Sequence, residues 1–301
     1  MQIVVRQISG LGNQLFQYAA GRYYGQRYKA SMRLALDPPH RAVANGLPRP
    51  FLLSHFCIGA AAETVTTWES LLLSRRRWLQ PSLAAVHAAA RTQVYAEPAA
   101  RRCTFIRDLP LRPGVERLYL AGYWQSWEMV ANVAEALRAE FAFREAPTGR
   151  NAEVLEQIQA TAEPVSLHIR RGDYTLASEG QRALPLSYYV GGIEHFRERL
   201  QRPTFFVFSD DIAWARANLP ADLRVVFVDH NDAVTAHEDL RLMSGCGHHI
   251  IANSSFSWWG AWMNRRADKQ VYAPKHWFLT GDSYYPGLLP PEWTLASSER
   301  T

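Results

Sequence analysis

The sequence predicts an α/β fold built on parallel β-sheets, and three observations support this prediction. From Val165 onward, short apolar runs alternate with longer segments that have helical periodicity. The apolar runs contain few polar residues, as expected for strands of a parallel sheet that is covered on both faces. The chain has 301 residues, which suits two domains or one large domain. Strand–helix alternation of this kind indicates βαβ units.

The first half of the chain is less regular than the second. Its predicted strands lie at 2–8, 31–36 and 118–121, with a helix between the first two strands and further helices from Trp68 to Trp78 and from about Trp127 to Ala139. Prolines interrupt the segment 37–117, and no motif within it indicates a function.

The second half carries the regular alternation. Its predicted strands are 165–169, 204–208, 224–228, 249–252 and 270–273, and its predicted helices are 187–200, 211–218, 234–245 and 256–266. The composition changes across 142–163, where Pro147 and Gly149 accompany polar helix formers. We therefore expect an N-terminal domain over 1–150 and a C-terminal domain over 151–301.

Charge and composition exclude several classes of protein. The net charge of +5 suits a small anionic ligand or weak attachment to a membrane surface, and no basic patch or nucleic-acid-binding motif is present. The three cysteines are far apart, which is typical of free thiols in a reducing compartment. The sequence contains neither a signal-peptide pattern nor 18 consecutive apolar residues. We expect a cytoplasmic protein without a membrane span.

A glycine turn, Gly10-Leu-Gly-Asn-Gln14, follows the first predicted strand and opens a helix. Glycines allow a tight turn, and the amide groups of a helix N-terminus attract anions. The segment is either a simple strand-to-helix turn or a phosphate-binding one. A dinucleotide fingerprint requires Gly or Ala where this chain has Leu15. A NAD-binding alternative would use Asp37 as the ribose partner.

The segment Val165-Ser-Leu-His-Ile-Arg-Arg-Gly-Asp-Tyr174 is the most informative in the chain. Its strand alternation places His168 and Arg170 on one side, and ligands of open α/β sheets bind beyond the carboxyl ends of strands. Guanidinium groups at that place suit a phosphate, which they grip bidentately. The alternatives are a solvated arginine pair, a buried structural histidine at His168, and a turn cap rather than a catalytic group at Asp173.

Two further predicted strands end in polar residues. Asp210 and Asp211 follow the strand at 204–208, and Asp211 is suited to cap the next helix. Ser254 and Ser255 follow the strand at 249–252, where a helix begins. These hydroxyl groups either cap that helix or hold a phosphate oxygen.

No metal site is predicted. A D-x-D spacing is absent, and the cysteine spacing does not suit zinc. His248 and His249 are adjacent on a strand and point to opposite faces, so they cannot easily share one ion.

Several of these segments together resemble the α-1,2-fucosyltransferases of glycosyltransferase family 11, the group that includes bacterial blood-group-H-type enzymes. The matching segments are Gly10-Leu-Gly-Asn-Gln-Leu-Phe-Gln-Tyr-Ala-Ala-Gly21, Gly122-Tyr-Trp-Gln125, His168-Ile-Arg-Arg-Gly-Asp-Tyr174, Phe206-Val-Phe-Ser-Asp-Asp211 and Ala252-Asn-Ser-Ser-Phe-Ser-Trp-Trp-Gly260. The resemblance implies a GT-B-like α/β fold, with two Rossmann-like lobes and a cleft between them.

The resemblance also implies the roles of individual residues. In the related α-1,6- and protein O-fucosyltransferases, the position that matches Arg170 grips the diphosphate. Positions that match His168 and Asp239 hold guanine, and the serine of the last motif, here Ser254 or Ser255, touches phosphate. The residues expected to bind GDP-fucose are Gly12, Asn13, His168, Arg170, Asp210, Asp239, Ser254 and Ser255.

The implied reaction moves L-fucose from GDP-β-L-fucose to the 2-hydroxyl of a terminal β-galactoside, with inversion and without a metal or other cofactor. Arg170 and Asp173 are the expected catalytic residues, while Asp173, Glu179 and His55 stay equal alternatives for a general base. The acceptor residues are expected to be Tyr123, Trp124 and Gln125, with core packing as the alternative for the aromatic rings. The other functions considered are fucose transfer in another linkage, a NAD-dependent oxidoreductase and a non-catalytic nucleotide-sugar-binding protein.

Overall fold

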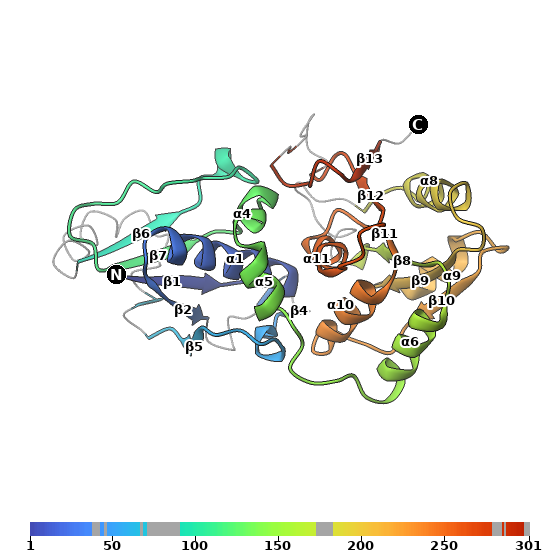
Figure 1. Cartoon of the computed structure of the whole chain (residues 1–301), viewed down its shortest axis with the longest axis horizontal. Helices are drawn as coiled ribbons and strands as arrows, with labels where there is room; N and C mark the ends of the chain where they lie inside the picture. The colour runs from blue at the N-terminus through green and yellow to red at the C-terminus, as the bar shows by residue number, and fades with distance from the viewer. Residues whose placement is uncertain are drawn as a thin grey trace. The chain divides into compact units, whose positions relative to one another are not determined.

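The computed structural model divides the chain into two compact units, each with its own parallel sheet (Figure 1). The described residues are 1–37, 43–44, 47–66, 69–70, 91–172, 183–278, 285 and 287–297. The first unit comprises Met1–Ala142 with Pro286–Leu289, and the second comprises Phe143–Tyr285 with Pro290–Thr301. Within the described ranges, no helix has the length and apolar character needed to cross a lipid bilayer.

The first unit contains a five-stranded parallel sheet in the order β5-β2-β1-β7-β6. Its strands are β1 (Gln2–Gln7), β2 (Ser31–Leu36), β5 (Ala61–Thr64), β6 (Thr92–Ala96) and β7 (Arg117–Ala121), and β3 (Val43–Ala44) and β4 (Leu47–Pro48) form a separate antiparallel pair. Its helices are α1 (Leu11–Arg27), α4 (Trp127–Asn132) and α5 (Ala134–Glu140), with short 3₁₀ turns at Leu53–His55 and Ala99–Arg101. Because β1 pairs with β2 on one side and β7 on the other, its carboxyl end lies at the centre of the sheet edge.

Helix α1 connects β1 to β2 and is buried along most of its length. It begins after Gly10, whose backbone is extended. Gly21 faces the side chains of Met32 and Val5, where a Cβ atom would collide with both. The absence of a side chain at Gly21 therefore allows the helix to lie close against the sheet.

The second unit contains a six-stranded parallel sheet in the order β10-β9-β8-β11-β12-β13. Its strands are β8 (Pro164–Ile169), β9 (Thr204–Ser209), β10 (Val225–Val228), β11 (His248–Ile250), β12 (Val271–Pro274) and β13 (Thr294–Ala296). Its helices are α6 (Gly149–Ala160), α8 (Leu186–Arg197), α9 (Ile212–Asn218), α10 (Ala236–Gly245) and α11 (Ser255–Met263). Numbered along the chain, the strands lie in the order 3-2-1-4-5-6, which is the doubly wound arrangement of nucleotide-binding Rossmann folds.

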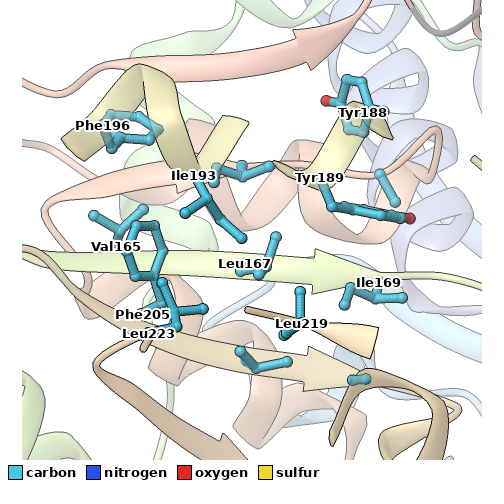
Figure 2. Close-up of a cluster of buried hydrophobic side chains, with 14 of the residues drawn as sticks. Val165, Leu167, Ile169, Tyr188, Tyr189, Ile193, Phe196, Phe205, Leu219 and Leu223 are labelled. Carbon is cyan, nitrogen blue, oxygen red and sulfur yellow. The ribbon is translucent and has the colours of Figure 1, made fainter. Parts of the chain in front are cut away.

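Helices cover both faces of the second sheet, and side chains alternate between two cores. Val165, Leu167 and Ile169 of β8 face α8, where Tyr189 and Ile193 pack against them (Figure 2). On the other face, β9 and β10 pack against α6 and α10; this core contains Val154, Ile158, Phe206, Phe208, Val228, Leu242, Met243 and Cys246. Burial on both faces explains why these strands read as apolar runs.

The predicted α/β class with two Rossmann-like units is confirmed. The predicted strands at 31–36 and 165–169 correspond to β2 and β8 almost residue for residue. Strands β5, β6 and β13 were not predicted, because they are short and β5 is exposed throughout. The predicted helix Trp68–Trp78 lies mostly outside the described residues.

Candidate active site

In the second unit, the direction in which the chain adds strands to the parallel sheet reverses between β8 and β11. The chain leaves β8 toward β9 and β10, then returns through α10 to β11 on the opposite side of β8. Ligands of doubly wound sheets bind outside the carboxyl ends of the two strands at such a switch point. The segments that follow these strands are Arg170–Gly172 and Ile251–Ser254. The arginine and serine motifs predicted from sequence are therefore brought to one edge.

Asp210, at the end of β9, holds the arginine segment in place. Its Oδ2 lies 3.1 Å from a guanidinium nitrogen of Arg170, and its Oδ1 accepts a 2.8 Å hydrogen bond from the backbone amide of Arg171. A Cβ atom at Gly172 would approach Oδ2 of Asp210 to 2.9 Å, so a larger residue there would have to displace this carboxylate. Asp210, expected to bind the donor, thus has both carboxylate oxygens engaged by the arginine segment.

The two neighbouring arginines have different surroundings. The guanidinium of Arg171 lies 4.0 Å from the ring centroid of Trp214 and 3.4 Å from the carboxylate of Asp211. Asp211 also caps α9, because its Oδ1 accepts a 3.0 Å hydrogen bond from the Trp214 amide. Arg171 is therefore committed to α9, whereas Arg170 is held at the end of β8.

His168 is buried on the face that carries α10 and α11. It pairs in register with Phe208 and its ring lies 5.7 Å from that of Phe256. Burial, followed by the positive charge of Arg170, lowers the pKa of His168 to about 3, so the ring is neutral at physiological pH. Its Nδ1 has no hydrogen-bond partner among the described residues, although only 5% of the residue is exposed. A buried and unpaired ring nitrogen is suited to a ligand contact.

The N-terminus of α11 lies beyond β11. Ser254 caps it, and its hydroxyl oxygen accepts a 3.3 Å hydrogen bond from the amide of Phe256. The preceding Asn253 donates a 3.1 Å hydrogen bond to the carbonyl of Trp277, which fixes the turn. Ser255 begins the helix. The backbone N–H groups and the dipole of a helix N-terminus favour an anion there.

Asp239 lies in the first turn of α10, where its Oδ1 accepts a 2.7 Å hydrogen bond from the side-chain amide of Asn231. Burial raises the pKa of its carboxyl to about 7. A carboxylate with this little hydration favours a ligand that offers N–H donors. Neither Asn231 nor its neighbour Asn151 was singled out from the sequence, since lone asparagines carry no pattern that marks them as functional.

His249, the fully buried one of the two histidines in β11, has a structural role. Asn264 donates a 2.8 Å hydrogen bond to Nε2 of His249, so Nδ1 carries the proton and donates to the hydroxyl of Ser166 at 2.8 Å. This arrangement cannot activate Ser166, because the histidine nitrogen that faces it is not a base. Within the parts of the chain that the structure describes, no group of three or more His, Cys, Asp or Glu residues is arranged to hold a metal ion.

In the first unit, the loops after β1 and β7 are joined at the centre of the sheet edge. Asn13 accepts a 2.7 Å hydrogen bond from the side chain of Gln125 and donates to the hydroxyl of Ser9 at 3.0 Å. The buried amide of Gln17 bonds both the backbone of Ile8 and the carbonyl of Gly122. Asn13 and Gln125, predicted for donor and acceptor respectively, therefore lie together, and Gly12 lies beside them in the first turn of α1.

The turn that carries the predicted acceptor residues is held by Glu97. Its carboxylate accepts hydrogen bonds from the backbone amides of Tyr123 at 2.8 Å and Trp124 at 3.1 Å. Trp124 has a positive φ of 56° and is only 2% exposed, with its ring packed against Tyr24 and Tyr95. The ring of Trp124 is thus packed in the interior, the alternative considered from sequence, while Tyr123 is half-buried.

Three residues considered for proton transfer have different outcomes. Asp173 and Glu179 lie outside the described residues. His55 is exposed at the end of a 3₁₀ turn in the first unit.

Comparison with known proteins identifies the family. The family model for glycosyl transferase family 11 matches residues 107–280. An alpha-1,2-colitosyltransferase from Escherichia coli is 29% identical over 97% of each chain. The O-antigen biosynthesis glycosyltransferase WbnK, also from Escherichia coli, is 30% identical over 91% of this chain and 97% of its own. Galactoside alpha-(1,2)-fucosyltransferase 1 from Saimiri boliviensis boliviensis is 28% identical over 58% of this chain and 50% of its own.

Solved structures support the same fold. The fucosyltransferase NodZ from Bradyrhizobium covers 86% of this chain and 92% of its own, with a TM-score of 0.51 at 16% identity. A NodZ structure soaked with GDP-fucose has a TM-score of 0.50 at 17% identity over 87% of this chain and 92% of its own. The predicted GT-B-like α/β class is confirmed by these neighbours. The chain is a glycosyltransferase and belongs to glycosyltransferase family 11.

Proposed function

We propose that this glycosyltransferase moves L-fucose from GDP-β-L-fucose to the 2-hydroxyl of a terminal β-galactoside, with inversion at the anomeric carbon and without a metal ion. The observation that carries the proposal is the placement of Arg170 and the N-terminus of α11 at the switch point between β8 and β11. The α-1,2 linkage is supported by the names of the related colitosyltransferase and galactoside fucosyltransferase. The GDP-fucose donor is supported by the NodZ structure soaked with it.

Arg170 and the α11 amides are suited to stabilise the leaving nucleotide. Cleavage of the bond between the sugar and the diphosphate leaves negative charge on GDP and an oxocarbenium-like sugar ring. A guanidinium offers paired N–H donors to phosphate oxygens, and the helix N-terminus adds further donors near Ser254. These groups are in place before the reaction, so little reorganisation is needed as the charge develops.

His168 and Asp239 are suited to bind the guanine. A carboxylate accepts hydrogen bonds from the two adjacent donors of guanine, N1–H and the 2-amino group, which uracil does not offer. Both residues lie on the side of the sheet that carries α10, since His168 pairs with Phe208 and Phe208 packs in the core beneath that helix. The base would then occupy the side of the sheet opposite α8.

The NAD-dependent alternative is disfavoured by the state of Asp37. Its carboxylate is bound by the guanidinium of Arg6, with hydrogen bonds of 2.9 Å to Oδ2 and of 3.2 and 3.3 Å to Oδ1. A ribose hydroxyl would have to displace this ion pair. Leu15 occupies the place of the third small residue of a dinucleotide fingerprint.

A direct assay tests the proposal. The protein is incubated with GDP-fucose and lactose, with and without EDTA, and GDP release is followed while the product linkage is read by NMR. We expect an α-1,2-linked product and undiminished turnover in EDTA. A protein that binds GDP without turnover, or whose activity is abolished by chelation, would refute the proposal.

A second candidate function is transfer of colitose in the same linkage. The relative that shares 97% coverage in both directions is named a colitosyltransferase. Colitose is fucose without its 3-hydroxyl group, so parallel assays with the two GDP-activated sugars separate the candidates. A panel of galactosides in each assay then identifies the acceptor.

A further inference from the structure

A network of side-chain amides connects α6, the loop after β10 and α10. Asn151 at the start of α6 and Asn231 in the loop form a reciprocal amide pair, with hydrogen bonds of 3.0 and 2.9 Å. Asn231 also donates a 2.7 Å hydrogen bond to Oδ1 of Asp239, and His230 Nε2 lies 2.8 Å from Oδ1 of Asn151. The network therefore ends at a carboxylate near the carboxyl edge of the second sheet.

The hydrogen bonds of this network have one consistent direction. The carboxylate form of Asp239, which is the form that a ligand N–H donor requires, can only accept hydrogen bonds. In that form the amide nitrogen of Asn231 faces Asp239 and the amide oxygen of Asn231 accepts from Asn151. The oxygen of Asn151 then faces His230, whose Nε2 must carry a proton. Each amide orientation is thus determined by its neighbour. The side-chain amide of Asn231 is therefore held with its nitrogen, rather than its oxygen, toward Asp239.

The loop between Asn231 and Asp239 is also held in one conformation. Oδ1 of Asp232 accepts hydrogen bonds from the amides of Val234 and Thr235, at 2.8 and 3.0 Å. The hydroxyl of Thr235 in turn accepts from the amide of Asp232 at 2.8 Å. This hydrogen-bonded turn leads directly into α10. The turn therefore restrains the distance between Asn231 and Asp239.

Asp239 has capacity for a ligand beyond its bond to Asn231. Its Oδ2 has no partner in the described part of the chain. The neighbouring Glu238 is occupied by Arg241, at 2.8 Å, and so does not compete for a ligand donor. Because Asn231 holds Oδ1, rotation of the carboxylate is restrained before a ligand arrives. Such fixation matters for a group that must meet two adjacent N–H donors at once.

We propose that Asn231 is a positioning residue, supported by Asn151, that sets the base selectivity of the nucleotide site through Asp239. The inference rests on the proposed use of a GDP-linked donor. It assigns to Asn231 the task of orienting the carboxylate so that it engages the 2-amino group of guanine as well as N1–H. Without Asn231 the carboxylate rotates, and the second of these hydrogen bonds is weakened more than the first.

The test compares GDP with inosine diphosphate, which keeps N1–H and lacks the 2-amino group. Dissociation constants of both nucleotides are measured by calorimetry for the wild-type protein and for Asn231→Ala, Asn151→Ala, Asp239→Ala and Asn218→Ala. Asn218 is the matched control, because its amide bonds only the carbonyl of Trp214 on the exposed side of α9. The ratio of the two constants is unaffected by a general loss of folded protein.

We expect the wild-type protein and Asn218→Ala to prefer GDP by about tenfold, the value of one hydrogen bond. Asp239→Ala should abolish the preference, and Asn231→Ala should reduce it by about threefold or more. Asn151→Ala removes the amide that bonds Asn231 and should also reduce the preference for GDP. This variant provides the test if Asn231→Ala does not fold.

An unchanged preference in the folded Asn231 and Asn151 variants, or in Asp239→Ala, would overturn the inference. Sugar transfer by the wild-type protein in that case would leave the proposed function intact. A wild-type protein that binds neither nucleotide would refute both.

Discussion

Replacement of Arg170 by alanine tests the central electrostatic argument. Arg170 follows β8, and its guanidinium lies 3.1 Å from the carboxylate of Asp210. In the proposed complex this guanidinium makes two charge-assisted hydrogen bonds to the diphosphate. Each such bond contributes about 1.5–3 kcal/mol, so the pair contributes about 3–6 kcal/mol. If most of this stabilisation develops with the leaving charge, kcat/KM should fall by about 10²–10⁴-fold.

The ion pair between Arg170 and Asp210 allows a second, independent test, in which Asp210 is also replaced. In Arg170→Ala the carboxylate of Asp210 is left beside the diphosphate without its cation. At a separation of about 6 Å and an effective dielectric constant of about 20, the repulsion is about 3 kcal/mol. Asp210 is partly exposed, so screening reduces this value. We expect Asp210→Asn to raise kcat/KM about tenfold when it is added to Arg170→Ala. In the wild-type background the same change should lower kcat/KM, because Arg170 loses the carboxylate that orders its side chain.

Arg171→Ala is the matched control. Its guanidinium packs on Trp214 and pairs with Asp211, so its removal should affect stability by about 1 kcal/mol and change kcat/KM by no more than about threefold. Steady-state GDP release at saturating lactose and varied GDP-fucose provides the assay. Equal losses at Arg170 and Arg171, or an Arg170→Ala activity within tenfold of wild type, would show that the reasoning is wrong.

Three further predictions concern stability and the loops of the first unit. Because His168 stays neutral when folded, with a pKa of about 3 against 6.5 when unfolded, its contribution to stability is greatest above pH 6.5 and is lost as the pH falls. Between pH 6.5 and 5, urea denaturation should show wild type losing about 1.6 kcal/mol relative to His168→Gln, and parallel pH profiles would contradict this. Glu97→Ala leaves two backbone amides without an acceptor and should lower the free energy of unfolding by about 2–4 kcal/mol, with a smaller loss in Glu97→Gln, which keeps an oxygen acceptor. Asn13→Ala and Gln125→Ala should be non-additive in unfolding by about 0.5–1.5 kcal/mol in a double-mutant cycle, whereas additivity would mean that their 2.7 Å bond contributes nothing.

The second sheet could be predicted from sequence because burial on both faces leaves a direct trace in composition. The strand at 165–169 is buried at every position, and the structure places it at the centre of the sheet. Strand β5 leaves no such trace, because all four of its residues are exposed and its place in the sheet depends on backbone pairing with β2. Helix α6 was not predicted either, since its stretch 142–163 was read as the domain boundary and only Val154 and Ile158 are buried within it.

For the candidate site, the sequence predicted which motifs follow which strands, but not the contacts that individual side chains make. Strand ends that carry Arg170 and Ser254 were expected at one edge, and the strand order brings them there. The resemblance favoured Arg170 over Arg171, but the contacts that commit Arg171 to another role could not be predicted from the sequence. They depend on Trp214, 43 positions farther along the chain from Arg171, and on the cap at Asp211. Long-range contacts of single residues carry no periodicity that a sequence pattern can reveal.

In the proposed complex, Asp210 assists anion binding by ordering the arginine segment rather than by contacting the anion. An isolated arginine side chain samples many rotamers, and fixing it costs up to about 2 kcal/mol of conformational entropy. By engaging Arg170 at 3.1 Å and the Arg171 amide at 2.8 Å, Asp210 imposes that order before the donor binds. A diphosphate carries more charge than one carboxylate, so in the proposed complex it competes with Asp210 for the guanidinium. The carboxylate would then regain a share of Arg170 when the nucleotide leaves, so the site returns to an ordered state after each turnover.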